Sequence, residues 1–291
     1  MPLPSHGRYD YVPITRRPDF TWPGGKRLAV YVAVNLEHFA FGEGLGAALA
    51  PGGPQPDVLN YAWRDYGNRV GAWRMLEMLD ELTLPSCAIA NAAMFEYAPE
   101  LPKAFAARGD EIVAHGRSNS ERQGDLDPAA EAKLIADSTE TLTRHAGTPP
   151  RGWLGPWISQ SRVTPDLLQE AGYAYLLDWC HDDQPTWFRT RRGRILSVPY
   201  PQELNDIPAI VARQMDAPAF ADMIVDQFQE MQRQSRGQSL VMGIALHPYI
   251  VGQPHRLAHL RRALSEIASN RERLWLTTPG AIAAAFAALP Q

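Results

Sequence analysis

Apolar runs alternate with segments of helical spacing along most of the chain. The run Leu28–Leu36 is continuous and apolar, which is typical of a buried strand. Residues 60–82 carry apolar side chains at intervals of three and four, which predicts an amphipathic helix. Strand character recurs in residues 87–93, 111–115, 152–155, 173–180, 195–200, 240–247 and 274–277. Strands that alternate with helices in this way pair in parallel through crossovers.

Proline and glycine mark the boundaries of the later helices. A proline near the start and a glycine at the end delimit 128–147, 165–172 and 218–237, and Thr278 with Pro279 begins a last helix. The pattern predicts an α/β protein with a (β/α) barrel of seven or eight parallel strands in one domain, 24–291, preceded by an N-terminal arm, 1–23. A doubly wound open sheet is the alternative, although no glycine-rich phosphate loop follows the first strand.

Composition narrows the class of protein. A chain of 291 residues with 45% apolar and 21% charged residues is ordinary for a globular barrel domain. The net charge of −4 argues against nucleic acid as a partner. No apolar run approaches the roughly 18 residues of a membrane span, and the first residues do not resemble a signal peptide. We therefore expect a cytoplasmic protein with no membrane partner, whose two cysteines, Cys87 and Cys180, are buried thiols.

Polar residues follow several of the predicted strands directly. Glu37 and His38 follow the first strand, His115 ends the third, and His247 ends the very apolar run 240–247. Because the carboxyl ends of barrel strands converge at one rim, such residues are candidates for an active site. His115 and His247 are the strongest candidates among the histidines.

Eight segments resemble the polysaccharide deacetylase superfamily, also called carbohydrate esterase family 4 or NodB-like. They are 34–38, 65–73, 115–119, 152–156, 178–185, 197–200, 205–206 and 246–249. Within the superfamily, the chain is similar to the branch of PuuE-type bacterial allantoinases. The resemblance implies a hydrolase acting on a carbon–nitrogen bond, with an acidic base, a divalent metal held by a second acid and two histidines, and a late histidine as the acid. It also implies a homo-oligomer, with a tetramer favoured.

Three positions depart from the deacetylase pattern. Where the first motif has two adjacent aspartates, this chain has Glu37 and His38 or, in another register, Asn35 and Glu37. The second metal-binding histidine is replaced by Asn119, and the arginine of the third motif by Leu154. The metal site implied by the resemblance is therefore altered.

Two outcomes follow for the cofactor. A divalent metal, most favourably zinc, would be held by Glu37, His115 and either His38 or Asn119. Without a metal, Glu37 would be the base that activates water, and His115 or His247 would be its proton partner. Strand alternation places His38 on the face opposite to Glu37, and the allantoinase branch implies metal-free chemistry, so the metal-free outcome is favoured.

Further candidates come from the other matching segments. Asp183 is expected to orient a catalytic histidine or bind substrate N–H groups. The candidates for substrate binding are Asn119, Tyr66, Arg69, Trp157, Asn205 and Asp206. A surface ion pair for Arg69 and a turn cap for Asn205 or Asp206 are the structural alternatives.

A small substrate is expected, because residues 42–60 and 184–194 are long enough to close the rim. The sequence thus predicts hydrolysis of a small amide, imide or cyclic ureide. Allantoin itself is less certain to be the substrate, since allantoinases have Glu-Glu-Gly where this chain has residues 37–39. The alternatives are a metal-dependent N-deacetylase of a sugar or acylated amine, and a non-catalytic binding barrel.

Overall fold

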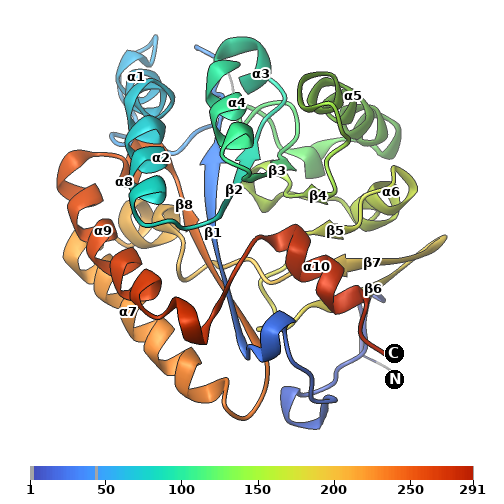
Figure 1. Cartoon of the computed structure of the whole chain (residues 1–291). Coiled ribbons are helices and arrows are strands. Elements are labelled where there is room, and N and C mark those ends of the chain that lie inside the picture. The colour runs from blue at the N-terminus through green and yellow to red at the C-terminus, as the bar shows by residue number, and fades with distance from the viewer. Residues whose placement is uncertain (1–2, 43–44, 291) are drawn as a thin grey trace.

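One sheet of mostly parallel strands forms the centre of the computed structural model, which describes residues 3–42 and 45–290 (Figure 1). The strand order is β6-β7-β5-β4-β3-β2-β1-β8, and β9 pairs with the first residues of β1. The strands are β1 (Leu28–Leu36), β2 (Ser86–Ala90), β3 (Glu111–Ala114), β4 (Gly152–Trp153), β5 (Tyr175–Leu176), β6 (Thr186–Thr190), β7 (Gly193–Ser197), β8 (Leu240–Leu246) and β9 (Trp275–Leu276).

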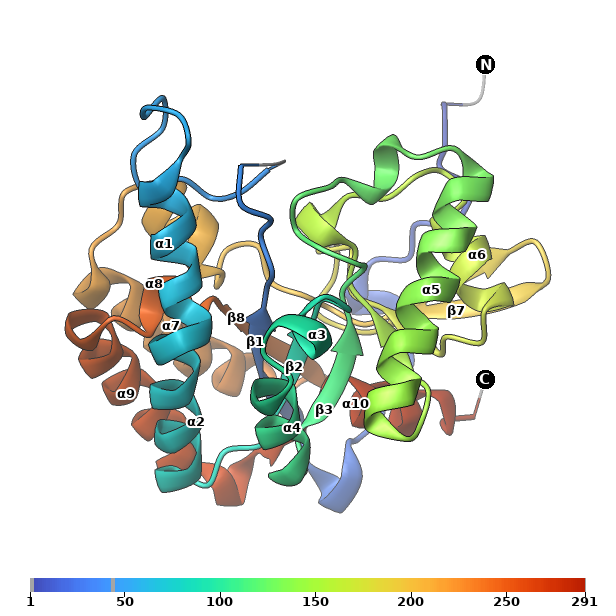
Figure 2. The same cartoon turned by 90° about the horizontal axis from the view of Figure 1, so that it is seen from above.

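Helices surround this sheet, with α1 and α2 on one flank and α5 and α6 on the other (Figure 2). The helices are α1 (Val58–Tyr66), α2 (Ala72–Glu81), α3 (Met94–Tyr97), α4 (Glu100–Ala107), α5 (Pro128–Ala146), α6 (Thr164–Glu170), α7 (Ala217–Gln234), α8 (Pro248–Val251), α9 (Pro254–Ser269) and α10 (Pro279–Ala287). Two π-helical turns, η3 (Gly67–Gly71) and η6 (Ile207–Ala212), join or precede them. Among the described residues, every helix is too short or too polar to cross a membrane.

The boundaries of α5 are formed by the capping residues that the sequence predicts. Asp127 begins α5 by accepting from the backbone N–H groups of Ala129 and Ala130, both at 2.9 Å. Gly147 ends it in the left-handed conformation, with φ of 77°. The segment 60–82 is continuous as predicted, except that η3 separates α1 from α2.

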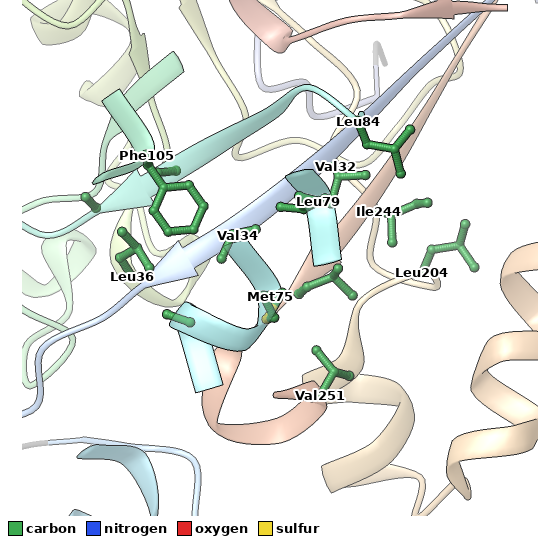
Figure 3. Packing of buried hydrophobic residues seen from close by; sticks show 14 of the residues in the cluster. Val32, Val34, Leu36, Met75, Leu79, Leu84, Phe105, Leu204, Ile244 and Val251 are labelled. Atoms are coloured by element: carbon green, nitrogen blue, oxygen red, sulfur yellow. The ribbon is translucent and has the colours of Figure 1, made fainter. Parts of the chain in front are cut away.

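Strand β1 separates two apolar cores. Its even-numbered residues pack outward against helices, and Figure 3 shows Val32, Val34 and Leu36 on the side covered by Met75 and Leu79 of α2. Its odd-numbered residues, including Ala29, Tyr31 and Ala33, lie in the interior cluster enclosed by the sheet. This alternation fixes which residues after the strand turn inward.

The two edges of the sheet meet without forming a ladder. The edge strands, β6 and β8, do not pair with each other. An isolated bridge between Asn205 and Ala245 and a hydrogen bond of 2.8 Å from Val241 N to Asp183 O link the two edges. We call this junction the seam. The eight predicted strands are confirmed as parallel elements, and the fold is of the distorted (β/α) barrel class, with its edges joined through loop residues.

Two expectations about single segments are wrong. Residues 184–194 do not cover the rim, because β6 pairs antiparallel with β7 and forms a hairpin. The fifth strand ends at Leu176, which leaves the free thiol of Cys180 exposed in the following loop, whereas Cys87 is buried as expected.

The N-terminal arm packs against its own chain. Arg8 pairs with Asp166 at 2.8 Å, and the backbone N–H of Arg189 in β6 donates to Arg8 O at 2.8 Å. The ring of Tyr9 stacks on His181 with centroids 4.5 Å apart. These contacts extend the sheet edge at β6.

Trp22 joins the arm to the amino-terminal end of the sheet. Its side chain is 2% exposed, and its Nε1 donates to Leu240 O at 3.0 Å. Truncation of a buried tryptophan leaves a cavity and removes the hydrogen bond to Leu240 O, so Trp22→Ala is expected to lower the free energy of unfolding by about 3–5 kcal/mol. Urea unfolding followed by circular dichroism measures this change. Tyr11→Ala, at a side chain that is 85% exposed, is the control and should leave the midpoint unchanged.

Candidate active site

Glu37 lies at the carboxyl end of β1 and points to the interior. The alternation of the strand continues past Leu36, so Glu37 takes the same face as Asn35. Its side chain is 5% exposed. Asn68 Nδ2 in η3 donates to Glu37 O at 2.9 Å, which holds the end of β1 against the helix.

His115 follows β3 and faces the same carboxylate. Its backbone N–H donates to Ala90 O at 3.1 Å, which continues the ladder between β2 and β3. The Nδ1 atom lies 2.7 Å from Leu154 O, and because a carbonyl oxygen only accepts, Nδ1 carries a proton. Nε2 is buried without a hydrogen-bond partner and lies 3.6 Å from Glu37 Oε1.

The orientation of Asn119 is determined by backbone groups acting through Asn91. The Oδ1 of Asn91 accepts from His38 N at 2.8 Å, and its Nδ2 donates to the backbone oxygen of His115. The same Nδ2 donates to Asn119 Oδ1 at 2.9 Å. Asn119 must therefore turn its own Nδ2 toward Glu37, and it donates to Oε1 at 2.6 Å.

His247 lies between two carboxylates at the end of β8. Asp206 Oδ1 lies 2.6 Å from His247 Nδ1, and Oδ2 accepts from the backbone N–H of His247 at 2.7 Å. His247 Nε2 lies 3.4 Å from Glu37 Oε1. Tyr249, in α8, donates its hydroxyl to Glu37 Oε2 at 3.4 Å. All of these side chains are buried.

The charges of this group stabilise one another. Burial raises the pKa of Glu37, but His247 and His115 have the larger effect and lower this pKa to about 2. Burial lowers the pKa of His247, but Asp206 and Glu37 raise it to about 10. Burial raises the pKa of Asp206, although His247 opposes this rise. At neutral pH the arrangement is therefore an imidazolium between two carboxylates.

These donors do not match a zinc site. A catalytic zinc takes three protein ligands and leaves one position for water. Glu37 and His115 provide two, but Asn119 presents an N–H donor, which has no lone pair for a metal, and its oxygen is bound to Asn91. Within residues 3–42 and 45–290, no three His, Cys, Asp or Glu side chains are grouped to hold a metal ion.

His38, the other candidate ligand, faces away from this group. Its ring contacts the edge of Tyr97 with centroids 5.2 Å apart, on the outer side of the strand end. Asn35, the candidate of the other register, donates to Tyr200 Oη at 3.2 Å and to Leu246 O at 3.3 Å, deeper in the interior. Glu37 is thus the residue of this motif that meets His115 and His247.

Asp183 does not reach the cluster, which corrects its expected catalytic role. Its backbone oxygen pairs with Val241 at the beginning of β8, whereas His247 follows the end of the same strand. Six residues of strand place the two positions about 20 Å apart. The histidine partner expected of Asp183 is Asp206 instead.

The two neighbouring aspartates have structural partners. Asp178 Oδ1 accepts from Gly155 N at 2.6 Å, and burial raises the pKa of Asp178 to about 7. Asp182 pairs with Arg17 of the N-terminal arm at 2.5 Å.

Three of the expected substrate-binding residues are not brought to the cluster. The hydroxyl of Tyr66 accepts from Arg74 on the same helical segment. Arg69 is exposed. Asn205 Oδ1 accepts from Ile207 N at 3.1 Å and caps the turn η6, as the structural alternative proposed.

Trp157 lies beside Asn119. Its Nε1 donates to Asn119 O at 2.9 Å, and 37% of its surface is exposed. Its φ of 63° is unusual for a bulky residue, and backbone strain of this kind is often found at functional sites.

Sequence reasoning missed Tyr249, Asn91 and Asn68. Tyr249 is two residues after His247, and Asn91 directly follows β2, so both had a positional signal. Asn68 had none, because its contact with Glu37 O depends on the packing of η3.

Comparison with known proteins connects this site to a family. No family model matches the chain. A polysaccharide deacetylase homologue of Schizosaccharomyces pombe is 25% identical over 92% of each chain. A solved polysaccharide deacetylase homologue of Pseudomonas aeruginosa is 26% identical, with a TM-score of 0.82 over 93% of this chain and 94% of the other.

A second solved structure, that of PuuE allantoinase, is 25% identical, with a TM-score of 0.82. It aligns with 97% of this chain and with 100% of its own. Sequence and structure thus agree over nearly the full length of the chain. These comparisons support membership of the polysaccharide deacetylase superfamily, with similarity to the PuuE-like branch.

Proposed function

We propose that this chain, a hydrolase of carbon–nitrogen bonds other than peptide bonds, opens or cleaves a small amide, imide or cyclic ureide without a metal. The observation that carries the proposal is the imidazolium of His247 between Glu37 and Asp206, with its Nε2 3.4 Å from Glu37 Oε1. An acid and a base lie next to each other, as hydrolysis of such a bond requires.

In the proposed reaction, Glu37 removes a proton from water as the water oxygen attacks the carbonyl carbon. His247 then donates its Nε2 proton to the leaving nitrogen, and the carbon–nitrogen bond breaks. When His247 loses its proton, its positive charge no longer lowers the pKa of Glu37, while burial continues to raise that pKa. Glu37 therefore becomes a stronger base as the reaction proceeds and retains the proton it has taken.

The neighbouring residues have supporting roles in this proposal. Asn119 keeps Glu37 oriented through its hydrogen bond, and Asp206 keeps His247 protonated. His115 Nε2 is free to accept a hydrogen bond from water or from a substrate N–H group. Trp157 offers an aromatic surface for a planar ring. Similarity to PuuE allantoinase makes cyclic ureides, with allantoin first, the substrates to test.

Chelator resistance is the test of this proposal. The purified protein is expected to contain much less than one zinc per chain and to open cyclic ureides at the same rate with and without EDTA. Metal analysis and a ring-opening assay measure both. About one zinc per chain, together with loss of activity in EDTA, would contradict the metal-free mechanism.

A zinc-dependent N-deacetylase is the second candidate. It is supported by the polysaccharide deacetylase relative and by the unpartnered Nε2 of His115, an atom suited to a metal. The orientation of Asn119 argues against it. The tetramer stays a prediction for this chain.

A further inference from the structure

Arg64 is a buried cation without a partner carboxylate. It lies in the last turn of α1, and the residue is only 9% exposed. Its Nε has no hydrogen-bond partner, and no carboxylate of the described residues lies within ion-pair distance of it. Burying an arginine without a counter-ion is unfavourable, so such a residue is typically retained for a ligand.

The guanidinium lies near the proposed catalytic group. Its Cζ is 4.6 Å from the ring centroid of Phe39, two residues after Glu37. The ring of Phe39 meets Tyr249 edge-on at 6.0 Å, and Tyr249 donates to Glu37. Beyond ion-pair distance, Arg64 interacts electrostatically with Asp57 and, more weakly, with Tyr249 and Glu37. Asn68, one helical turn later, bonds the backbone of Glu37.

Residues 46–50 cover Arg64. A Cβ atom on Gly46 would lie 1.2 Å from Arg64 Nη1, so the backbone of that segment rests directly on the guanidinium. Asn60 holds the same segment, because its Oδ1 accepts from Leu49 N at 2.7 Å and from Ala50 N at 3.1 Å. Only 9% of Arg64 is exposed, and reduced contact with water strengthens any charge interaction that the guanidinium makes.

We propose that Arg64 forms an anion subsite that receives a carboxylate group of the substrate. The inference rests on the proposed function and narrows it: the substrate is a small amide or ureide that carries a carboxylate. The guanidinium presents a planar fork of N–H donors that matches a carboxylate in bidentate geometry. The cleft is lined by Arg64, Asn68, His38, Tyr61 and Tyr97 and by one carboxylate, Asp65, whose Oδ1 accepts from Tyr97 at 2.6 Å.

The test uses malonate and its neutral diamide, malonamide, as probes in isothermal titration calorimetry. The wild-type protein is expected to bind malonate and to bind malonamide much more weakly. Arg64→Met keeps the apolar stem over Phe39 and removes the charge, and it should weaken malonate binding about 10- to 100-fold. Arg144→Met is the matched control at an exposed arginine of α5 and should bind malonate like the wild type.

Equal affinity of the wild type for malonate and malonamide would overturn the subsite, as would unchanged malonate affinity in Arg64→Met. If that variant does not fold by circular dichroism, Arg64→Lys decides. Lysine keeps the charge but not the fork, and an affinity loss smaller than that of methionine but above the error of the Arg144→Met control is expected. Affinity equal to the wild type would refute a bidentate contact.

Binding is measured here without turnover, so the two proposals can fail separately. If malonate binding depends on Arg64 but no ureide is hydrolysed, the proposed anion subsite stands and the proposed hydrolase function is refuted. If neutral ureides are opened but malonate binding does not depend on Arg64, the proposed function stands and the proposed subsite is refuted.

Discussion

Glu37→Gln is expected to lower kcat by about 10²- to 10⁴-fold, the usual contribution of a positioned general base. Glutamine can accept the hydrogen bond from Asn119 through its oxygen, but it cannot take a proton from water. The substrate affinity should change little, since the loss concerns the chemical step. Steady-state kinetics on a cyclic ureide separates kcat from KM.

Glu140→Gln is the matched control for this prediction. Glu140 is an exposed residue of α5 that pairs only with Arg144, and its replacement should leave kcat unchanged. A Glu37→Gln variant that kept more than about a tenth of the wild-type kcat would rule out Glu37 as the base. A wild-type protein that bound ureides with no turnover would favour the non-catalytic barrel.

Asp206→Asn is expected to lower kcat at neutral pH by about 10²- to 10⁴-fold. The reason is that the negative charge of Asp206 is the main stabiliser of the protonated His247 imidazole. In the wild type, the pKa of His247 is about 10, so the proton needed for the leaving nitrogen is present at neutral pH. Without the negative charge of Asp206 the pKa of His247 falls, and the alkaline limb of the kcat profile moves to lower pH. Asp222→Asn, at an exposed partner of Arg262, is the control.

The same substitution has a signature in stability. The folded protein binds the His247 proton more tightly than the unfolded chain, whose histidine titrates near 6.5. This contribution is complete below pH 6.5 and is lost as the pH rises toward 10. Asp206→Asn should flatten that part of the unfolding profile. An NMR titration that found the same His247 pKa in both proteins would refute the assignment.

Much of the fold could be predicted because its determinants are local. The uninterrupted apolar run of β1 and the caps of α5 depend on residues close in sequence, and both are confirmed. Strand β6 was missed because residues 186–190 mix threonine, arginine and aromatic side chains and do not form an apolar run. Its pairing depends on β7 and on the arm rather than on burial alone.

The candidate site was predictable only in part, for a related reason. Glu37, His115 and His247 were found because each follows a strand end. Asp183 was expected to orient a histidine and Asp206 to bind substrate or cap a turn, and both lie in loops rich in polar residues. The correct partner depends on which loop crosses the seam near the end of β8. Asp206 and His247 are 41 positions apart in the sequence, and nothing in the sequence between them indicates that they meet.

The orientation of Asn119 could not be predicted at all. Asparagine offers an oxygen or an N–H group, and its residue type does not say which one faces Glu37. The decision is made by Asn91 and two backbone groups, which come from separate loops.

The seam is a place where the structure can open locally before it unfolds as a whole. Asn205, which directly precedes Asp206, is joined to β8 by an isolated bridge rather than by a ladder, so the position of Asp206 beside His247 depends on a few separate contacts. Openings of such junctions require less free energy than global unfolding. Mild denaturant or heat can therefore separate Asp206 from His247 while the rest of the sheet is intact, and catalytic inactivation would precede the loss of secondary structure.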